Sequence, residues 1–151
     1  MCDIQVYLDA RSGRGRHGRH HEEHSTRLGV VETTGVQRFK LSPSGERVLI
    51  WGSGGWEVRD LEGWELLLSG GSEIGTAAVS DTHLALASSN LISLWKLGED
   101  TEPRILIHHD RVTSLAFSPR DELLASASDD RTTRLWSLKD TEDRKLLWSR
   151  S

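Results

Sequence analysis

Residues 107–138 read IHHDRVTSLAFSPRDELLASASDDRTTRLWSL, and this stretch decides the fold. It predicts three short strands over 112–117, 123–128 and 132–138, because these runs are rich in β-branched, aromatic and small apolar residues. Pro119 presets φ in the first connecting turn, and the aspartates of the second turn bond their own backbone. The stretch therefore predicts an antiparallel sheet with tight turns.

This stretch resembles the WD-repeat family, whose repeats build the blades of β-propellers. His108 precedes the first strand by four residues, where the family places the histidine of its Gly-His pair. Asp130 matches the family's turn aspartate, and Trp136 matches its third-strand tryptophan. Ile107 replaces the usual glycine, and Ser137 replaces the aspartate of the Trp-Asp pair. The resemblance implies a four-stranded blade.

A repeat with the same period extends toward the N-terminus. Ser42, Ser80 and Ser118 each follow an apolar run and stand 38 residues apart (80 − 42 and 118 − 80). A period near 40 with strand and turn signals in every unit is typical of propeller blades. We expect three blades, at about 36–69, 74–108 and 109–149. Their expected strands cover 36–41, 47–52, 56–60, 64–68, 76–79, 83–88, 92–96, 104–107, 112–117, 123–128, 132–138 and 144–148.

The first two repeats are degenerate. Glu32 and Gly70 occupy the positions that match the histidine, and Arg59 stands where the third repeat has its tryptophan. Trp95 is retained in the second repeat, but Ser89 takes the aspartate position. Helical periodicity is missing throughout. The predicted fold is all-β, a partial WD-repeat β-propeller of three four-stranded blades over 31–151, behind a flexible N-terminal segment over 1–30.

Four polar residues of the third repeat match the family's structural hydrogen-bond network. They are His108, Ser126, Asp130 and Trp136. In a buried blade the aspartate accepts from the imidazole, which bonds the serine hydroxyl, which in turn bonds the indole N–H. A Ser-His-Asp set also suggests a hydrolytic triad. The structural interpretation is favoured, because the serine lies inside a strand without a nucleophile elbow. No catalytic residue is expected.

Residues 11–28 read RSGRGRHGRHHEEHSTRL, with almost nothing to bury. Such a composition predicts a flexible tail. His17, His20, His21 and His24 are candidate metal ligands, since imidazoles three or four residues apart meet on one helix face. The glycines disfavour that helix, so a solvated tail is the favoured interpretation. The Arg-Gly alternation could instead contact RNA phosphates.

The composition narrows the function classes. The net charge is −4, whereas dedicated nucleic-acid binders are usually basic. Lone Cys2 excludes an internal disulfide and fits a reducing compartment. No apolar run approaches the roughly 18 residues of a membrane span. We expect an intracellular protein, with the cytoplasm favoured and the nucleus left open, and no cofactor.

Exposed turns around the third repeat carry the candidate partner-binding residues. The resemblance places these on one rim: His109, Asp110, Arg111, Asp129 and Arg131. It implies a non-catalytic protein–protein interaction scaffold. The alternative is a nucleic-acid or metal contact made by the N-terminal tail, with the blades as carrier. An enzyme is the third hypothesis, for which no metal signature, phosphate loop or nucleophile motif is found.

Three blades cannot close a ring, because propellers close with typically about four to eight. The end blades would then present uncovered apolar faces, which need caps or partners. Four outcomes follow: a piece of a longer propeller, self-association of two chains, docking on another propeller-like protein, or an open arc. The first is favoured.

Overall fold

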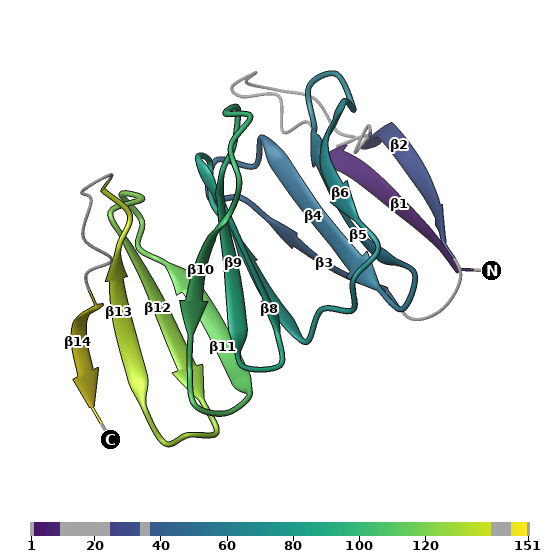
Figure 1. Ribbon diagram of the computed structural model, residues 1–151. Coiled ribbons are helices and arrows are strands. Elements are labelled where there is room, and N and C mark those ends of the chain that lie inside the picture. Colours follow the sequence, from purple (N-terminus) through teal and green to yellow (C-terminus); the bar gives the residue numbers. More distant parts are fainter. Residues whose placement is uncertain (1, 10–24, 34–36, 140–145, 151) are drawn as a thin grey trace, which may run out of the picture.

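The computed structural model describes residues 2–9, 25–33, 37–139 and 146–150 (Figure 1). All regular elements in these ranges are β-strands, and twelve of them form three four-stranded antiparallel sheets. The predicted all-β fold with three four-stranded blades is therefore confirmed. Among these residues no helix has the length and apolar character to cross a membrane.

Blade 1 contains β3 (Gln37–Leu41), β4 (Arg47–Gly52), β5 (Gly55–Asp60) and β6 (Leu66–Gly70), paired in that order. The last strand starts two residues later than the sequence predicts, and a turn explains the shift.

In this turn the carboxylate of Asp60 accepts the backbone N–H groups of Glu62 and Gly63, at 2.8 and 3.3 Å. Trp64 then adopts a left-handed φ of 56°. The turn therefore continues past Trp64 before β6 begins.

Blade 2 contains β7 (Thr76–Val79), β8 (His83–Ser88), β9 (Leu91–Lys96) and β10 (Arg104–Ile107). These bounds lie within one residue of the expected strands. The sheet order is again sequential, from β7 to β10.

Blade 3 contains β11 (Val112–Phe117), β12 (Leu123–Ser128), β13 (Thr133–Ser137) and β14 (Leu146–Arg150), also in sequential order. The third strand is one residue shorter at each end than expected. The fourth lies two residues beyond its expected C-terminal bound.

The N-terminal region differs from the expectation. The sequence predicts a flexible segment over 1–30, but β1 (Cys2–Asp9) pairs with β2 (Ser25–Thr33) in an antiparallel two-stranded sheet. The structure thus places strands at 2–9 and 25–30 within this segment. Ile4 lies directly opposite Val31 in the register of these two strands. Residues 10–24 lie outside the described part of the chain.

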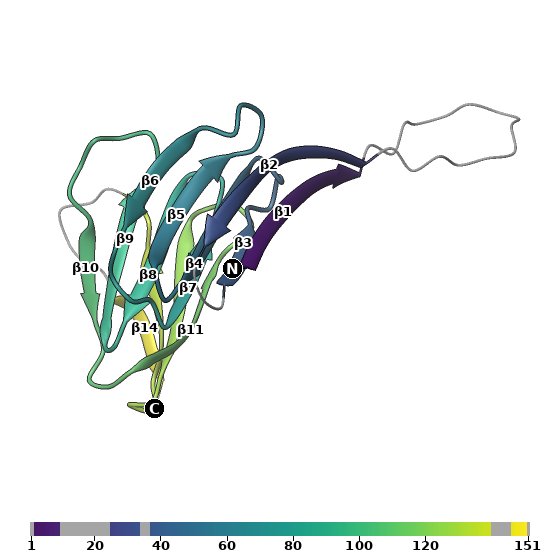
Figure 2. The same ribbon diagram turned by 90° about the vertical axis from the view of Figure 1, so that its right-hand side faces the viewer.

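The blades stand side by side with their first strands innermost. β7 contacts β3 on one side and β11 on the other, and Figure 2 shows the sheets fanning outward from these strands. We call the face toward the N-terminal neighbour the leading face of a blade, and the opposite one its trailing face. Alternate residues of a strand point to opposite faces. Ala77 and Leu84 of blade 2 therefore pack with blade 1, and Ala78 and Ala85 with blade 3.

The even spacing of the three serines has a structural cause. Each serine follows the first strand of a blade, and its hydroxyl accepts the backbone N–H of the first residue of the second strand. The pairs are Ser42 with Arg47 (3.1 Å), Ser80 with His83 (2.9 Å) and Ser118 with Leu123 (3.0 Å). The hydroxyl thus closes the turn between the first and second strands of every blade. The 38-residue spacing of the serines is therefore the spacing of these turns.

Candidate interaction rim and its buried hydrogen-bond network

The junction between blades 2 and 3 is organised by a chain of buried polar side chains. His108 lies just after β10, and its Nδ1 is 2.9 Å from Oδ2 of Asp130 in the β12–β13 turn. Its Nε2 is 2.7 Å from the hydroxyl of Ser126 on β12. The indole Nε1 of Trp136 on β13 donates to the same hydroxyl at 2.9 Å. The structure thus brings all four predicted network residues together.

The direction of each hydrogen bond follows from its fixed ends. The indole N–H of Trp136 can only donate, so the Ser126 oxygen accepts it and its own hydrogen points to Nε2 of His108. The carboxylate of Asp130 accepts from Nδ1–H. One neutral imidazole tautomer therefore satisfies every group in the chain, as buried polar groups require.

Asp130 is the hub of this network. It accepts the hydroxyl and the backbone N–H of Thr132, at 2.5 and 2.8 Å, and the backbone N–H of His109 at 3.0 Å. Burial alone would raise the pKa of the Asp130 carboxyl. The hydrogen bonds from Thr132, His109 and His108 outweigh burial and hold that pKa well below its usual range.

The Ser-His-Asp set is sealed from solvent. His108 is 1% exposed and Ser126 is 2% exposed. The serine oxygen also accepts the Trp136 indole N–H. A nucleophile must reach its substrate and needs an oxyanion site beside it. In this geometry the three residues hold the blades together and leave no space for a substrate.

The five predicted rim residues lie directly above this network, and all are exposed: His109, Asp110, Arg111, Asp129 and Arg131. They come from the β10–β11 connection and the β12–β13 turn. Arg111 pairs with Asp129 at 3.0 Å, and the backbone N–H of Asp129 donates to the Arg111 carbonyl at 2.8 Å. The two loops are thus bonded to each other through both side chains and backbone.

These loops are also fixed by residues that the sequence analysis did not single out. The amide of Asn90 donates to the His108 carbonyl at 3.0 Å, and the Ser128 hydroxyl donates to the Asp110 carbonyl at 2.9 Å. The Arg134 guanidinium donates to the Ile107 carbonyl at 2.7 Å. Each contact joins a side chain to the backbone carbonyl of a residue 18 or 27 positions away, so no local motif in the sequence marks it.

The junction of blades 1 and 2 replaces the polar network with aromatic packing. Gly70 stands at the histidine position, and Leu86 lies in the register position that Ser126 holds in blade 3. Trp95 on β9 instead packs against Trp56 on β5, with ring centroids 5.3 Å apart. Trp51 lies directly opposite Trp56 and belongs to the same buried cluster. Three indoles thus fill the space between these blades.

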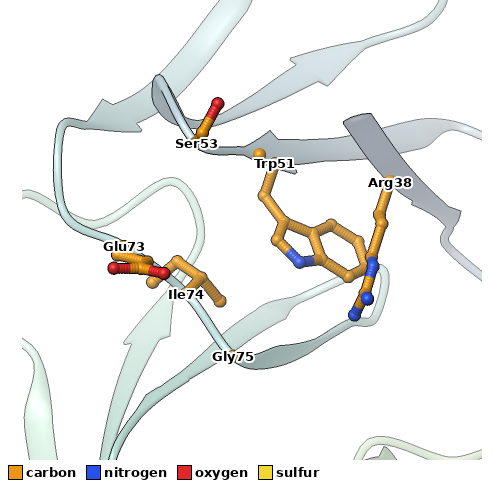
Figure 3. A pocket seen from close by; sticks show the side chains of 7 residues that line it. Arg38, Trp51, Ser53, Glu73, Ile74 and Gly75 are labelled. Carbon is orange, nitrogen blue, oxygen red and sulfur yellow. The ribbon is translucent and has the colours of Figure 1, made fainter. Parts of the chain in front are cut away.

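A pocket of about 450 Å³ opens on the same edge of the array, at the junction of blades 1 and 2. It lies between the β4–β5 turn and the β6–β7 connection. Figure 3 shows the indole of Trp51 beside Arg38, with Ile74 and Glu73 across the space. The indole nitrogen of Trp51 is buried and has no hydrogen-bond partner among the described residues. The pocket is thus lined by one cationic and one anionic side chain, Arg38 and Glu73.

The four candidate metal ligands, His17, His20, His21 and His24, lie outside the described residues. Within 2–9, 25–33, 37–139 and 146–150, no group of three or more His, Cys, Asp or Glu side chains is arranged to hold a metal ion.

Comparison with known families matches residues 101–137 to the WD domain, G-beta repeat. This range includes β10, β11, β12 and β13, and it contains the whole polar network. The chain contains a WD repeat. The match begins before the outer strand of blade 2 and ends with the third strand of blade 3, so the WD repeat spans two blades.

Three curated relatives are similar over part of the chain. A U4/U6 small nuclear ribonucleoprotein PRP4-like protein of Arabidopsis thaliana is 38% identical over 55 residues, 35% of this chain. The Denticleless protein homolog of Gallus gallus is 41% identical over 63 residues, 39% of this chain. Pre-mRNA-processing factor 19 of Mus musculus is 38% identical over 65 residues, 41% of this chain. The matched segments cover only 10%, 9% and 13% of those proteins.

Proposed function

We propose that this chain is a non-catalytic protein–protein interaction scaffold of the WD-repeat type. The partner-binding surface in this proposal is the rim formed by His109, Asp110, Arg111, Asp129 and Arg131. The carrying observation is that a sealed hydrogen-bond network holds the two rim loops in one conformation while their charged side chains face solvent.

A rigid rim suits binding because it is ordered before a partner arrives. Ordering loops and long side chains at the moment of binding costs about 0.5–1.5 kcal/mol for each immobilised side chain. The Arg111–Asp129 pair and its backbone bonds already fix part of the rim. Mixed charge on such a surface favours a partner with complementary charges and contributes mainly to specificity and association rate.

The pocket beside Trp51 extends this surface along the same edge. The exposed Arg38 beside it favours an acceptor group on a bound partner. The proposal further treats the three blades as part of, or complement to, a larger propeller, because propellers close with typically about four to eight blades.

The experiment is quantitative capture by the immobilised full chain, with mass spectrometry of the bound proteins. The variants are Arg131→Glu on the rim and Lys139→Glu as matched control. Both residues are exposed, both changes shift the charge by about the same two units, and β13 separates the two positions at its opposite ends. We expect the rim variant to lose partners that the control retains.

Two outcomes count against the proposal. If the rim variant and the control captured the same proteins, the rim would be excluded as the binding surface. Loss of the same partners on deletion of residues 11–24, which leaves β2 intact, with rim variants unaffected, would assign binding to the N-terminal tail.

A further inference from the structure

The pocket at the junction of blades 1 and 2 carries two opposite charges that do not pair with each other. Arg38 on β3 and Glu73 in the β6–β7 connection both line it, and both are exposed. Among the described residues, neither side chain makes a hydrogen bond or an ion pair. Figure 3 shows Trp51 and Ile74 between them. The pocket therefore presents an apolar surface with an unpaired charge on each side.

Arg38 is not the cation that joins the two blades. Alternate residues of a strand share a face, so Lys40 lies on the same face of β3 as Arg38. The Lys40 ammonium donates to the Ala77 carbonyl of blade 2 at 2.7 Å. The contact between the blades therefore uses Lys40 and leaves the Arg38 guanidinium available to a ligand.

The next junction does not repeat this arrangement. Thr76 and Arg111 stand 38 residues after Arg38 and Glu73, and so hold the corresponding positions. Thr76 is uncharged, and Arg111 is paired with Asp129 at 3.0 Å. The two unpaired opposite charges are thus a property of the first junction and not of the repeat.

The walls of the pocket are fixed by backbone contacts. Gly55 follows the β4–β5 turn with a φ of 119°, and a Cβ at this position would collide with the Gly70 carbonyl oxygen. The turn and the start of the β6–β7 connection thus touch directly. At the other end of this connection the Gly75 N–H donates to the Ala87 carbonyl at 2.9 Å. The pocket is therefore formed before a ligand arrives, which lowers the entropic cost of binding.

The lining determines which ligand is complementary. The volume of about 450 Å³ lies within the usual range of ligand pockets, about 300–1,000 Å³. An anionic group next to Arg38 and a cationic group next to Glu73 gain charge-assisted hydrogen bonds. A polyanion such as a nucleic acid would pair with Arg38 but would be repelled by Glu73. The complementary ligand therefore carries both charges, with an apolar group between them.

We propose that this pocket binds a segment of a partner protein in which an acidic and a basic side chain flank an apolar one. The acidic side chain pairs with Arg38, the basic one pairs with Glu73, and the apolar one packs against Trp51 and Ile74. A polypeptide is the ligand class because a few residues supply all three groups and because the pocket opens on the same edge as the proposed rim. The assignment rests on the proposed scaffold function and adds a sequence preference to it.

The first test selects ligands from a phage-displayed library of random linear peptides on the immobilised full chain. We expect the enriched peptides to carry an acidic and a basic residue on either side of an apolar one. Selection without enrichment, or enrichment of peptides that lack either charge, would overturn the proposal.

The second test exchanges the charges on both sides of the contact. The most strongly enriched peptide, and a copy with its acidic and basic residues exchanged, are titrated by fluorescence anisotropy. The parent chain should bind the original peptide about tenfold more tightly. The double variant Arg38→Glu/Glu73→Arg should bind the exchanged peptide more tightly, because both opposite-charge pairs are restored. A double variant that keeps the parent's preference would overturn the proposal.

The control for this exchange is the double variant Lys139→Glu/Glu102→Arg, which makes the same charge changes at exposed residues outside the pocket. It should keep the parent's preference. Arg38 and Glu73 are exposed, so their variants should unfold at the parent's midpoint. Arg38→Gln and Glu73→Gln add no like charge, and each should weaken binding of the original peptide by about threefold. Unchanged affinity in both would count against the proposal.

The third test removes the apolar group of the ligand. Serine in place of the apolar residue of the selected peptide should raise the dissociation constant by about tenfold, since less apolar area is buried against Trp51 and Ile74. Equal affinity for the two peptides would overturn the assigned contact.

The pocket and the rim can fail separately in the capture experiment. Loss of partners with Arg131→Glu but not with Arg38→Glu would uphold the proposed scaffold function and overturn the pocket. Loss of partners with Arg38→Glu but not with Arg131→Glu would uphold the pocket and exclude the rim.

Discussion

Gly70 lies directly opposite Trp56 in blade 1, and a Cβ on this glycine would fall 2.7 Å from the indole nitrogen. The glycine occupies the position at which the third unit has His108. The same position therefore serves two kinds of junction. In one it supplies the imidazole of a polar network, and in the other its missing side chain makes room for an indole.

Gly70→Ala should destabilise the chain by about 1–3 kcal/mol, because the added methyl group displaces a buried indole in a packed junction. Gly71→Ala is the matched control, since no atom lies within 4 Å of its Cβ position. Denaturant unfolding of both variants measures the difference. Equal midpoints for the two would show that Trp56 moves aside without cost.

Asp130→Ala should cost about 1–3 kcal/mol of unfolding free energy, since it leaves buried donors of His108 and Thr132 without an acceptor. The control is Asp129→Ala in the same turn. It removes only an exposed ion pair with Arg111, which is worth about 0–1 kcal/mol. A larger loss at Asp129 than at Asp130 would assign the stability of this turn to its surface.

The stability of the fold should fall in acid partly through Asp130. Its folded pKa lies below the unfolded value of about 3.9, so its contribution is complete above that pH and is lost as the pH falls further. Asp130→Asn should be less stable at neutral pH but lose less stability below about pH 4 than the parent chain. Parallel curves of unfolding midpoint against pH for the two proteins would contradict this assignment.

Arg131→Gly should leave stability unchanged or raise it by up to about 1 kcal/mol. Arg131 has a φ of 68°, in the left-handed region that costs a side-chain-bearing residue about 1–2 kcal/mol and glycine nothing. The entropy of glycine in the unfolded chain offsets part of the gain. Arg120→Gly, where φ is not positive, should instead destabilise. The measurement is the thermal unfolding midpoint of both variants. A higher midpoint for Arg120→Gly than for the parent chain would refute the backbone explanation.

The blades could be predicted from the sequence because their signals are local. Turn residues such as Pro119 and the serines at 42, 80 and 118 mark strand ends directly, so most strand bounds agree within two residues. The pairing of β1 with β2 was missed because the partners of Ile4 lie across a polar stretch with no strand character. The packing of Trp51, Trp56 and Trp95 was not predicted either. It depends on which faces meet between blades, and no local pattern records that.

The matched repeat and the folded blade are out of phase. The 101–137 segment takes its first strand, β10, from one sheet and its other three from the next, and His108 lies in the connection between them. A fragment cut at the boundary between the two sheets would therefore deprive blade 3 of the imidazole that Asp130 and Ser126 both bond. Neighbouring sheets are thereby interlocked. A cut that keeps His108 together with Asp130 and Ser126 must therefore fall inside a sheet, between its third and fourth strands.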